Sequence, residues 1–165
     1  RKVKLIKVEN NLRKKVGYGK ISEESIARAE TLLQGNNIDF RDIARGIFEN
    51  FRKDLAIARG MSGHDPLLKE RLINSVMELK ANAPMFKYEL VGDLASIVLS
   101  FLEHIKELDK DAISIIEAHE KTLSIIIAKS IMGRGGALGE QLVSELESAC
   151  ARYYRKNPEK FKKPV

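Results

Sequence analysis

Apolar residues at helical spacing run through the middle of this chain, and this pattern constrains the fold more than any other feature. From Asp65 to Val91, leucine, valine and alanine recur every three or four residues, which places them on one face of a helix. Asp65 is suited to cap the first free N–H groups, and Pro66 suits the first helical position. Pro84 lacks an N–H and crowds the preceding turn, so we expect the helix to kink or end there. The expected buried face comprises Leu68, Leu72, Val76, Leu79 and Ala83.

The opposite face of this helix presents an apolar residue beside a cation. With about 100° of rotation per residue, Met77 lies about 140° from the centre of the buried face and points outward. Its neighbours on the helix surface include Ile73, Lys80 and Ala81. Methionine is common on adaptable binding surfaces, although a single exposed methionine carries little information. Together with Ile73, Ala81 and Met85, it favours a partner-binding face.

The run MELKANAPMFK, from Met77 to Lys87, resembles the active helix of histidine-containing phosphotransfer (HPt) domains. Their motif reads His-x-Leu-Lys-Gly-x-Ala, followed by Leu, Met or Phe and then Gly. Met77 replaces the phospho-accepting His, Ala81 the first Gly and Lys87 the second. The matching residues are Leu79, Lys80, Ala83 and Phe86. The chain also resembles bacterial single-domain HPt-like proteins along most of its length, including the opening LIKVENNLRKKVG and the late GRGGALG.

Each departure from the motif has a chemical meaning. A phosphotransfer His attacks a phosphoryl group through an imidazole nitrogen, and the thioether of Met77 has no such basic nitrogen. Lys80 is still placed to balance phosphate charge. Ala81 adds one methyl group where Gly would let a partner approach closely. The resemblance therefore implies a helix that keeps the shape of the HPt motif helix but lacks the group that accepts phosphate.

The composition indicates one domain without disulfides. A chain of 165 residues buries roughly two-thirds of its unfolded surface. Cys150 is the single cysteine, so neither an intramolecular disulfide nor a multi-cysteine metal site can form, and we expect no cofactor. No apolar run reaches the roughly 20 residues that span a bilayer, and no signal peptide is visible. We therefore expect a cytoplasmic protein with no membrane span.

Positive charge gathers at the two ends of the chain. Residues 1–20 carry eight Lys/Arg against one acid, and residues 152–165 carry six against one, whereas residues 21–151 have a net charge of −6. Basic ends can bind nucleic acid, but aromatic residues for base stacking are few, and we favour solvated termini. The expected organisation is a basic N-terminal segment (1–20), an HPt-like helical bundle (21–156) and a basic tail (157–165).

Periodicity outside the motif helix predicts further helices. One is expected at about 22–33, where it buries Ile26, Ala29, Leu32 and Leu33, and a second at 39–59. A third begins at about 85–88 and buries residues as far as Leu108, and a fourth follows Lys110 with inward residues as far as Ile131. The last is expected at about 138–155, where it buries Leu142, Leu146, Ala149 and Tyr153. The fold class is therefore all-α, an HPt-like up-down four-helix bundle with additional N- and C-terminal helices.

Other residues that could act in catalysis or in phosphate binding have simpler structural interpretations. His64 lies in a loop, His104 at the edge of an apolar face, and His119 nearer a core face, where we expect partial burial. Gly133-Arg134-Gly135-Gly136 lacks the strand and the Lys-Ser/Thr of a phosphate loop, so an inter-helix turn is favoured. Cys150 is expected in the core.

We therefore expect a non-enzymatic signalling protein of a two-component phosphorelay. The resemblance implies receiver domains of response regulators, or histidine kinases, as partners of an adaptor or competitor. The expected contact residues are Met77, Lys80, Ile73, Asn74, Ala81 and Met85. Two alternatives stay open: an active phosphotransfer protein that uses another His, and a nucleic-acid-binding protein that uses its basic ends.

Overall fold

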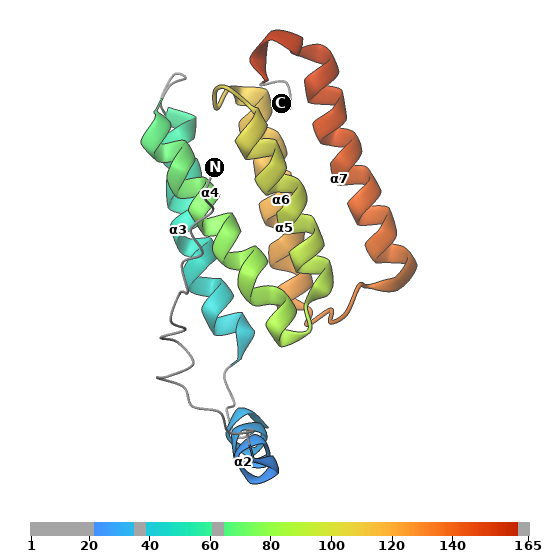
Figure 1. The fold of residues 1–165 in the computed structure, drawn as a ribbon. Helices are drawn as coiled ribbons and strands as arrows, with labels where there is room; N and C mark the ends of the chain where they lie inside the picture. The colour runs from blue at the N-terminus through green and yellow to red at the C-terminus, as the bar shows by residue number, and fades with distance from the viewer. Residues whose placement is uncertain (1–21, 35–38, 61–64, 162–165) are drawn as a thin grey trace, which may run out of the picture. The chain divides into compact units, whose positions relative to one another are not determined.

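The regular elements among the described residues are helices. The computed structural model describes residues 22–34, 39–60 and 65–161. Its α-helices are α2 (Glu23–Gln34), α3 (Phe40–Gly60), α4 (Pro66–Asn82), α5 (Glu89–His104), α6 (Lys110–Ala128) and α7 (Gly136–Lys156), with two 3₁₀ turns, η1 (Ala83–Phe86) and η2 (Pro158–Lys160) (Figure 1). Extended pairing in these ranges is limited to one isolated bridge between Ile105 and Phe161. The predicted all-α class is confirmed.

The chain divides into two compact units, residues 1–38 and 39–165. Helix α2 is the described element of the first unit, and its position agrees with the predicted helix. The predicted burial of Ile26 and Ala29 is wrong, because both side chains are exposed. The side chains of Leu32 and Leu33 lie outside the described part of the chain.

Five helices of the second unit pack against one another. Helix α3 contacts α4 and α6, and α5 contacts the same two helices, so these four enclose a common interior. Helix α7 packs on α5 and α6. Successive helices from α3 to α7 run in alternating directions (Figure 1). Short connections favour this antiparallel arrangement, because each helix returns directly along its predecessor.

The interior consists of two adjoining apolar clusters. One is centred on Leu72, Phe101 and Ile116, and the other on Leu79, Leu94 and Ile126. Ile97 packs against both clusters and so joins them. The motif helix α4 contributes to each, because its apolar residues continue over four turns. A fully buried leucine contributes about 2 kcal/mol through apolar surface removed from water.

The ends of α4 agree with the sequence. The carboxylate of Asp65 accepts hydrogen bonds from the backbone N–H groups of Leu67 (3.0 Å) and Leu68 (3.2 Å). Pro66 is the first helical residue, and the α-helix ends at Asn82, two residues before Pro84. The following 3₁₀ turn, η1, accommodates that proline. Both predicted end signals of the motif helix are therefore confirmed.

Some predicted features of the later helices need correction. Helix α5 ends at His104 because Ile105 has an extended conformation (φ −68°, ψ 143°), so Ile105 and Leu108 are buried in the connection to α6. Asp109 caps α6, and Lys110 is already helical. Four residues predicted on buried faces are only partly buried: Ile97, Ile131, Leu142 and Ala149.

The C-terminal residues that the structure describes fold back onto the body. Lys160 forms ion pairs with Asp109 (2.8 Å) and Glu107 (3.1 Å). The backbone N–H of Lys106 donates to the carbonyl oxygen of Lys160 at 2.8 Å, beside the Ile105–Phe161 bridge. Part of the predicted basic tail is therefore attached to the start of α6. The predicted basic segment 1–20, and residues 162–165 of the tail, lie outside the described residues.

Candidate functional site

Helix α4 has one tightly packed face and one exposed face. Leu72 is 0%, Val76 3% and Leu79 2% exposed, whereas Met77 is 51% exposed. The rotation argument from the sequence is therefore confirmed for Met77 and for the core-facing residues. The helix is fixed by its packed side, so the outward side chains project from a rigid support.

The predicted contact residues are mostly accessible. Met77, Lys80, Asn74, Ala81 and Met85 are exposed, while Ile73 is partly buried against the Phe101 cluster. Met85 is 78% exposed, but it projects from η1, and the other five project from α4. The structure therefore provides one helical face and a methionine on the turn beyond it.

Lys80 is a free cation on this face. It forms no ion pair with any residue of the ranges that the structure describes, whereas Arg71, on the same helix, pairs with Asp54 of α3 at 3.0 Å. Lys80 lies one turn after Met77, so a group that contacts the thioether also meets the ammonium charge. An anionic or mixed anionic and apolar surface is the chemistry that this pair favours.

Lys87 adopts a backbone conformation that favours glycine. Its φ is 63° and its ψ is 31°, in the left-handed region, and its N–H donates to the carbonyl oxygen of Pro84 at 3.0 Å. The neighbouring N–H of Tyr88 donates to the carbonyl oxygen of Ala83 at 3.0 Å. These bonds close η1, the turn that connects α4 to α5. A side chain at such a position costs about 1 kcal/mol relative to glycine.

The glycine-rich run after α6 forms a turn beside Lys87. Gly133 donates its N–H to the carbonyl oxygen of Lys87 at 2.7 Å and accepts from the N–H of Leu90 at 2.9 Å. At Gly139 a Cβ would lie 1.9 Å from the carbonyl oxygen of Arg134, which only glycine avoids. The predicted inter-helix turn is confirmed: Gly133, Gly135 and Gly136 have positive φ angles there, and Gly139 of α7 permits the close approach of the Arg134 carbonyl.

The histidines differ in accessibility. His119 is 0% exposed, deeper than the partial burial expected, and its Nδ1 lies 2.8 Å from the carbonyl oxygen of Ile115. Burial lowers the pKa of His119, and its Nε2 contacts no hydrogen-bond partner within the described residues. His104 is partly exposed, with Nδ1 2.7 Å from the carbonyl oxygen of Ser100. His64 lies outside the described residues.

Two further reactive groups among the described residues are buried. Cys150 is buried, as predicted, and burial raises the pKa of its thiol to about 12, so the thiolate nucleophile is scarce at neutral pH. Glu120 is buried, and Arg52 balances its charge. Its Oε1 accepts hydrogen bonds from Arg52 Nε at 2.8 Å and from Ser124 Oγ at 2.7 Å. Over the ranges 22–34, 39–60 and 65–161, no group of three or more His, Cys, Asp or Glu is placed to hold a metal ion.

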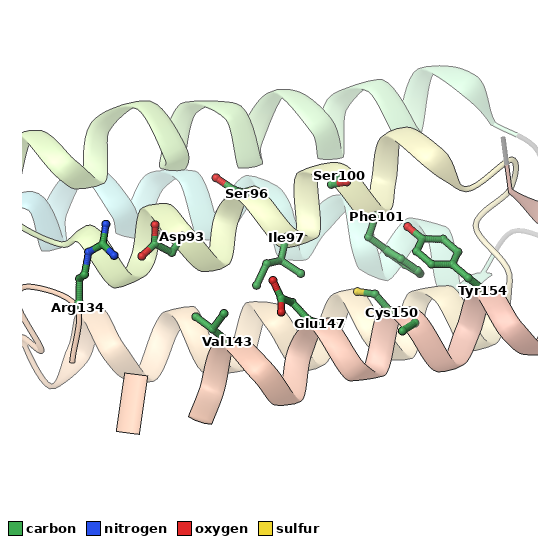
Figure 2. A pocket seen from close by; sticks show the side chains of 11 residues that line it. Asp93, Ser96, Ile97, Ser100, Phe101, Arg134, Val143, Glu147, Cys150 and Tyr154 are labelled. Atoms are coloured by element: carbon green, nitrogen blue, oxygen red, sulfur yellow. The ribbon is translucent and has the colours of Figure 1, made fainter. Parts of the chain in front are cut away.

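A groove between α5 and α7 was not predicted from the sequence. It has a volume of about 600 Å³ and is lined by Asp93, Ser96, Ile97, Ser100, Phe101, Arg134, Val143, Glu147, Cys150, Ala151 and Tyr154 (Figure 2). The sequence feature that could have indicated this groove is the pair Ser96 and Ser100, two small polar residues one turn apart on α5, the most apolar helix. The apolar periodicity of the sequence did not indicate that α7 would face this side of α5.

The comparisons with known proteins give no relative for this chain. No family model matches it, and no curated protein or solved structure does. None of the described helices combines the length and the apolar character that crossing a membrane requires.

Proposed function

We propose that this chain is a non-enzymatic protein of a two-component phosphorelay. In this proposal α3–α6 form an HPt-like four-helix bundle that lacks the phospho-accepting His. The bundle binds receiver domains of response regulators, or the histidine kinases that supply them, and acts in the cytoplasm as an adaptor or competitor. The proposal draws its partner class from the likeness of the α4 sequence to the HPt motif.

The observation that carries the proposal is the exposure of Met77. A side chain with 51% exposure stands in the middle of a helix whose opposite face is nearly inaccessible. In the HPt motif this position holds the His that meets the receiver. A thioether there supports apolar contact with a partner but offers no nitrogen to a phosphoryl group.

The conformation of Lys87 supports the same interpretation. The HPt motif has glycine at the corresponding position, and Lys87 has the positive φ that favours glycine. The backbone at Lys87 therefore has a conformation that glycine adopts readily. Lys80, which matches the motif Lys, is exposed and available to an acidic partner.

The two alternatives receive less support. Phosphotransfer through His119 would require a phosphoryl donor to reach a ring that has no exposed surface. Nucleic-acid binding would rest on the ends of the chain, because residues 21–151 carry a net charge of −6 and repel phosphates. Neither alternative uses the exposed face of α4.

A binding experiment with purified receiver domains tests the proposal. We expect at least one receiver to bind the native protein, and Met77→Asp to weaken that binding at least about tenfold by placing a charge in an apolar contact. Ile125→Asp is the matched control, because Ile125 is 54% exposed but lies on α6. Absence of binding to every receiver and kinase tested, or equal effects of the two substitutions, would contradict the proposal.

A further inference from the structure

The groove between α5 and α7 has an apolar floor. Ile97 and Phe101 contribute to it from α5, and Val143 and Cys150 contribute from α7 (Figure 2). Tyr154 forms one end, where its ring lies 5.6 Å from that of Phe101. Phe101 is 1% exposed and Cys150 6%, so the floor belongs to the packed core. An occupant would therefore meet a rigid apolar surface.

Two carboxylates, Asp93 and Glu147, flank this floor. Asp93 projects from α5 and Glu147 from α7, and neither forms an ion pair with a residue in the described ranges. By contrast, Glu117 and Glu120 of α6 pair with Arg59 and Arg52. Arg134 lies at the same end of the groove as Asp93, and Glu147 lies over the middle of the floor (Figure 2).

The charge of Glu147 reaches the floor of the groove. Burial is the main cause of the raised pKa of Cys150, and the Glu147 carboxylate adds to it. A cation placed over the floor would be attracted by this exposed carboxylate. The groove thus favours an occupant that combines apolar surface with positive charge.

The walls of the groove determine what kind of chain can occupy it. Both walls are continuous helices, whose backbone N–H and C=O groups bond within their own helix. An extended peptide would find no backbone partners there, whereas a helix satisfies its own backbone groups. The lining of α7 runs from Val143 to Tyr154, about 16 Å at 1.5 Å per residue, or roughly three helical turns.

We propose that this groove binds an amphipathic, basic helix of a partner protein. Apolar side chains of that helix, spaced by three or four residues, pack on the partly exposed side chains of Ile97, Val143 and Tyr154. Lysine or arginine side chains at its flanks pair with Glu147 and Asp93. Ser96 and Ser100 allow close approach, because their side chains are short and Ser96 Oγ is already bonded to the carbonyl oxygen of Gly92 at 2.9 Å. This site is separate from the α4 face and does not depend on the phosphorelay proposal.

A display selection tests this inference. A library of 16-residue helical peptides, with randomised charge at the flanks of one apolar face, is selected on the full chain. We expect the enriched peptides to be basic and to shift the amide NMR signals of Ser96, Ser100 and Tyr154 when they bind. A failure to enrich any peptide, or enrichment of acidic ones, would overturn the inference.

Charge-reversal variants locate the contact. Glu147→Lys should weaken binding of the enriched peptides at least about tenfold, whereas Glu145→Lys, an exposed position on α7 outside the groove, should change it less than about twofold. Selection on the Asp93→Lys, Glu147→Lys double variant should enrich acidic peptides instead. Equal weakening by the Glu145 and Glu147 substitutions would show that the peptides respond only to net charge.

A steric variant separates the groove from other surfaces. Ala151→Trp places a large ring at the groove and should abolish peptide binding, while Ser148→Trp, exposed on the same helix but not in the lining, should preserve it. Met77→Asp should also preserve it, since Met77 belongs to α4. If Ala151→Trp binds the peptides as the native protein does, the groove is not their site.

Discussion

The carbonyl oxygen of Lys87 accepts a 2.7 Å hydrogen bond from the N–H of Gly133, so the turn after the motif helix is joined to the glycine-rich turn before α7. Both residues have a positive φ, 63° at Lys87 and 70° at Gly133. The contact holds α4, α5 and α7 together at one end of the unit. One of its two residues is a glycine, and the other carries a side chain where glycine is preferred.

Replacing Lys87 by glycine should therefore stabilise the protein. We expect Lys87→Gly to raise the free energy of unfolding by roughly 0.5–1 kcal/mol, because the relief of the left-handed strain exceeds the added entropy of the unfolded chain. Chemical denaturation measures the change. Lys87→Ala removes the charge and keeps the Cβ, so it should give no such gain. If both variants raise the free energy of unfolding equally, the stabilisation comes from removal of the charge and not from relief of backbone strain.

The buried ring of His119 should make stability depend on pH. Burial lowers its pKa below the ordinary value of 6.5, so the unfolded chain binds a proton that the folded protein excludes. Stability is thus complete above about pH 6.5 and falls as the pH drops below it, by at most about 1.4 kcal/mol per pH unit. Denaturation midpoints between about pH 5 and 7.5 measure this decline.

His119→Gln provides the comparison, because it removes the titrating group and should flatten the decline in that pH range. His104→Gln should retain it, since the buried ring of His119 is still present. The decline has another origin if His119→Gln shows the same pH dependence as the native protein.

Asp109 both caps the start of α6 and binds the C-terminal residue Lys160. Its Oδ1 accepts from the backbone N–H of Ala112 at 2.7 Å, and its Oδ2 accepts from Lys160 Nζ at 2.8 Å and Tyr153 Oη at 3.1 Å. Burial opposes ionisation of this carboxyl, but these hydrogen bonds outweigh it and hold its pKa below the ordinary value. The cap and the C-terminal attachment thus share one side chain.

Asp109→Ala should destabilise the protein by roughly 1–2 kcal/mol through loss of the helix cap. Asp109→Asn keeps a capping oxygen and should cost less, while both variants should loosen the attachment of Lys160. Thermal unfolding gives the stability change, and amide hydrogen exchange at Lys106 reports the attachment. Equal destabilisation by alanine and asparagine would assign the effect to charge and not to capping.

Sequence periodicity predicted the motif helix well, because each of its determinants is local. Asp65, Pro66 and Pro84 act within one turn, and the inward residues of α4 follow from the 3.6-residue repeat. The exposure of Met77 followed from the same geometry. Its binding role rests on the HPt resemblance and stays a prediction.

The parts that could not be predicted depend on contacts between helices. The groove requires α7 to pack against α5 in a particular register, which no single helical pattern encodes. The complete burial of His119 likewise depends on packing around α6, whereas its position on the helix indicated only a boundary. The end of α5 at His104 was missed because Ile105 and Leu108 continue the apolar pattern after the backbone has become extended.

The last prediction asks whether the lost chemistry can be restored. If this chain is an HPt-like bundle that lacks its nucleophile, Met77→His with Ala81→Gly should supply the imidazole and the room for a receiver to approach. The new ring would project from the exposed face of α4, one turn from the unpaired ammonium group of Lys80. The glycine should cost roughly 1 kcal/mol of helix stability, which a domain of this size tolerates.

Phosphotransfer from radiolabelled receivers measures the outcome. The native protein should acquire no acid-labile, base-stable phosphate, and the double variant should acquire it from at least one receiver that the native protein binds. Lys80→Ala in the double variant should slow the transfer, because the lysine no longer balances the phosphoryl charge. Pro84 and Lys87 keep the turn different from the family motif, so slow transfer is expected. A folded double variant that neither binds nor accepts phosphate from any receiver would leave only a helical architecture in common with HPt domains, and the phosphorelay proposal would be wrong.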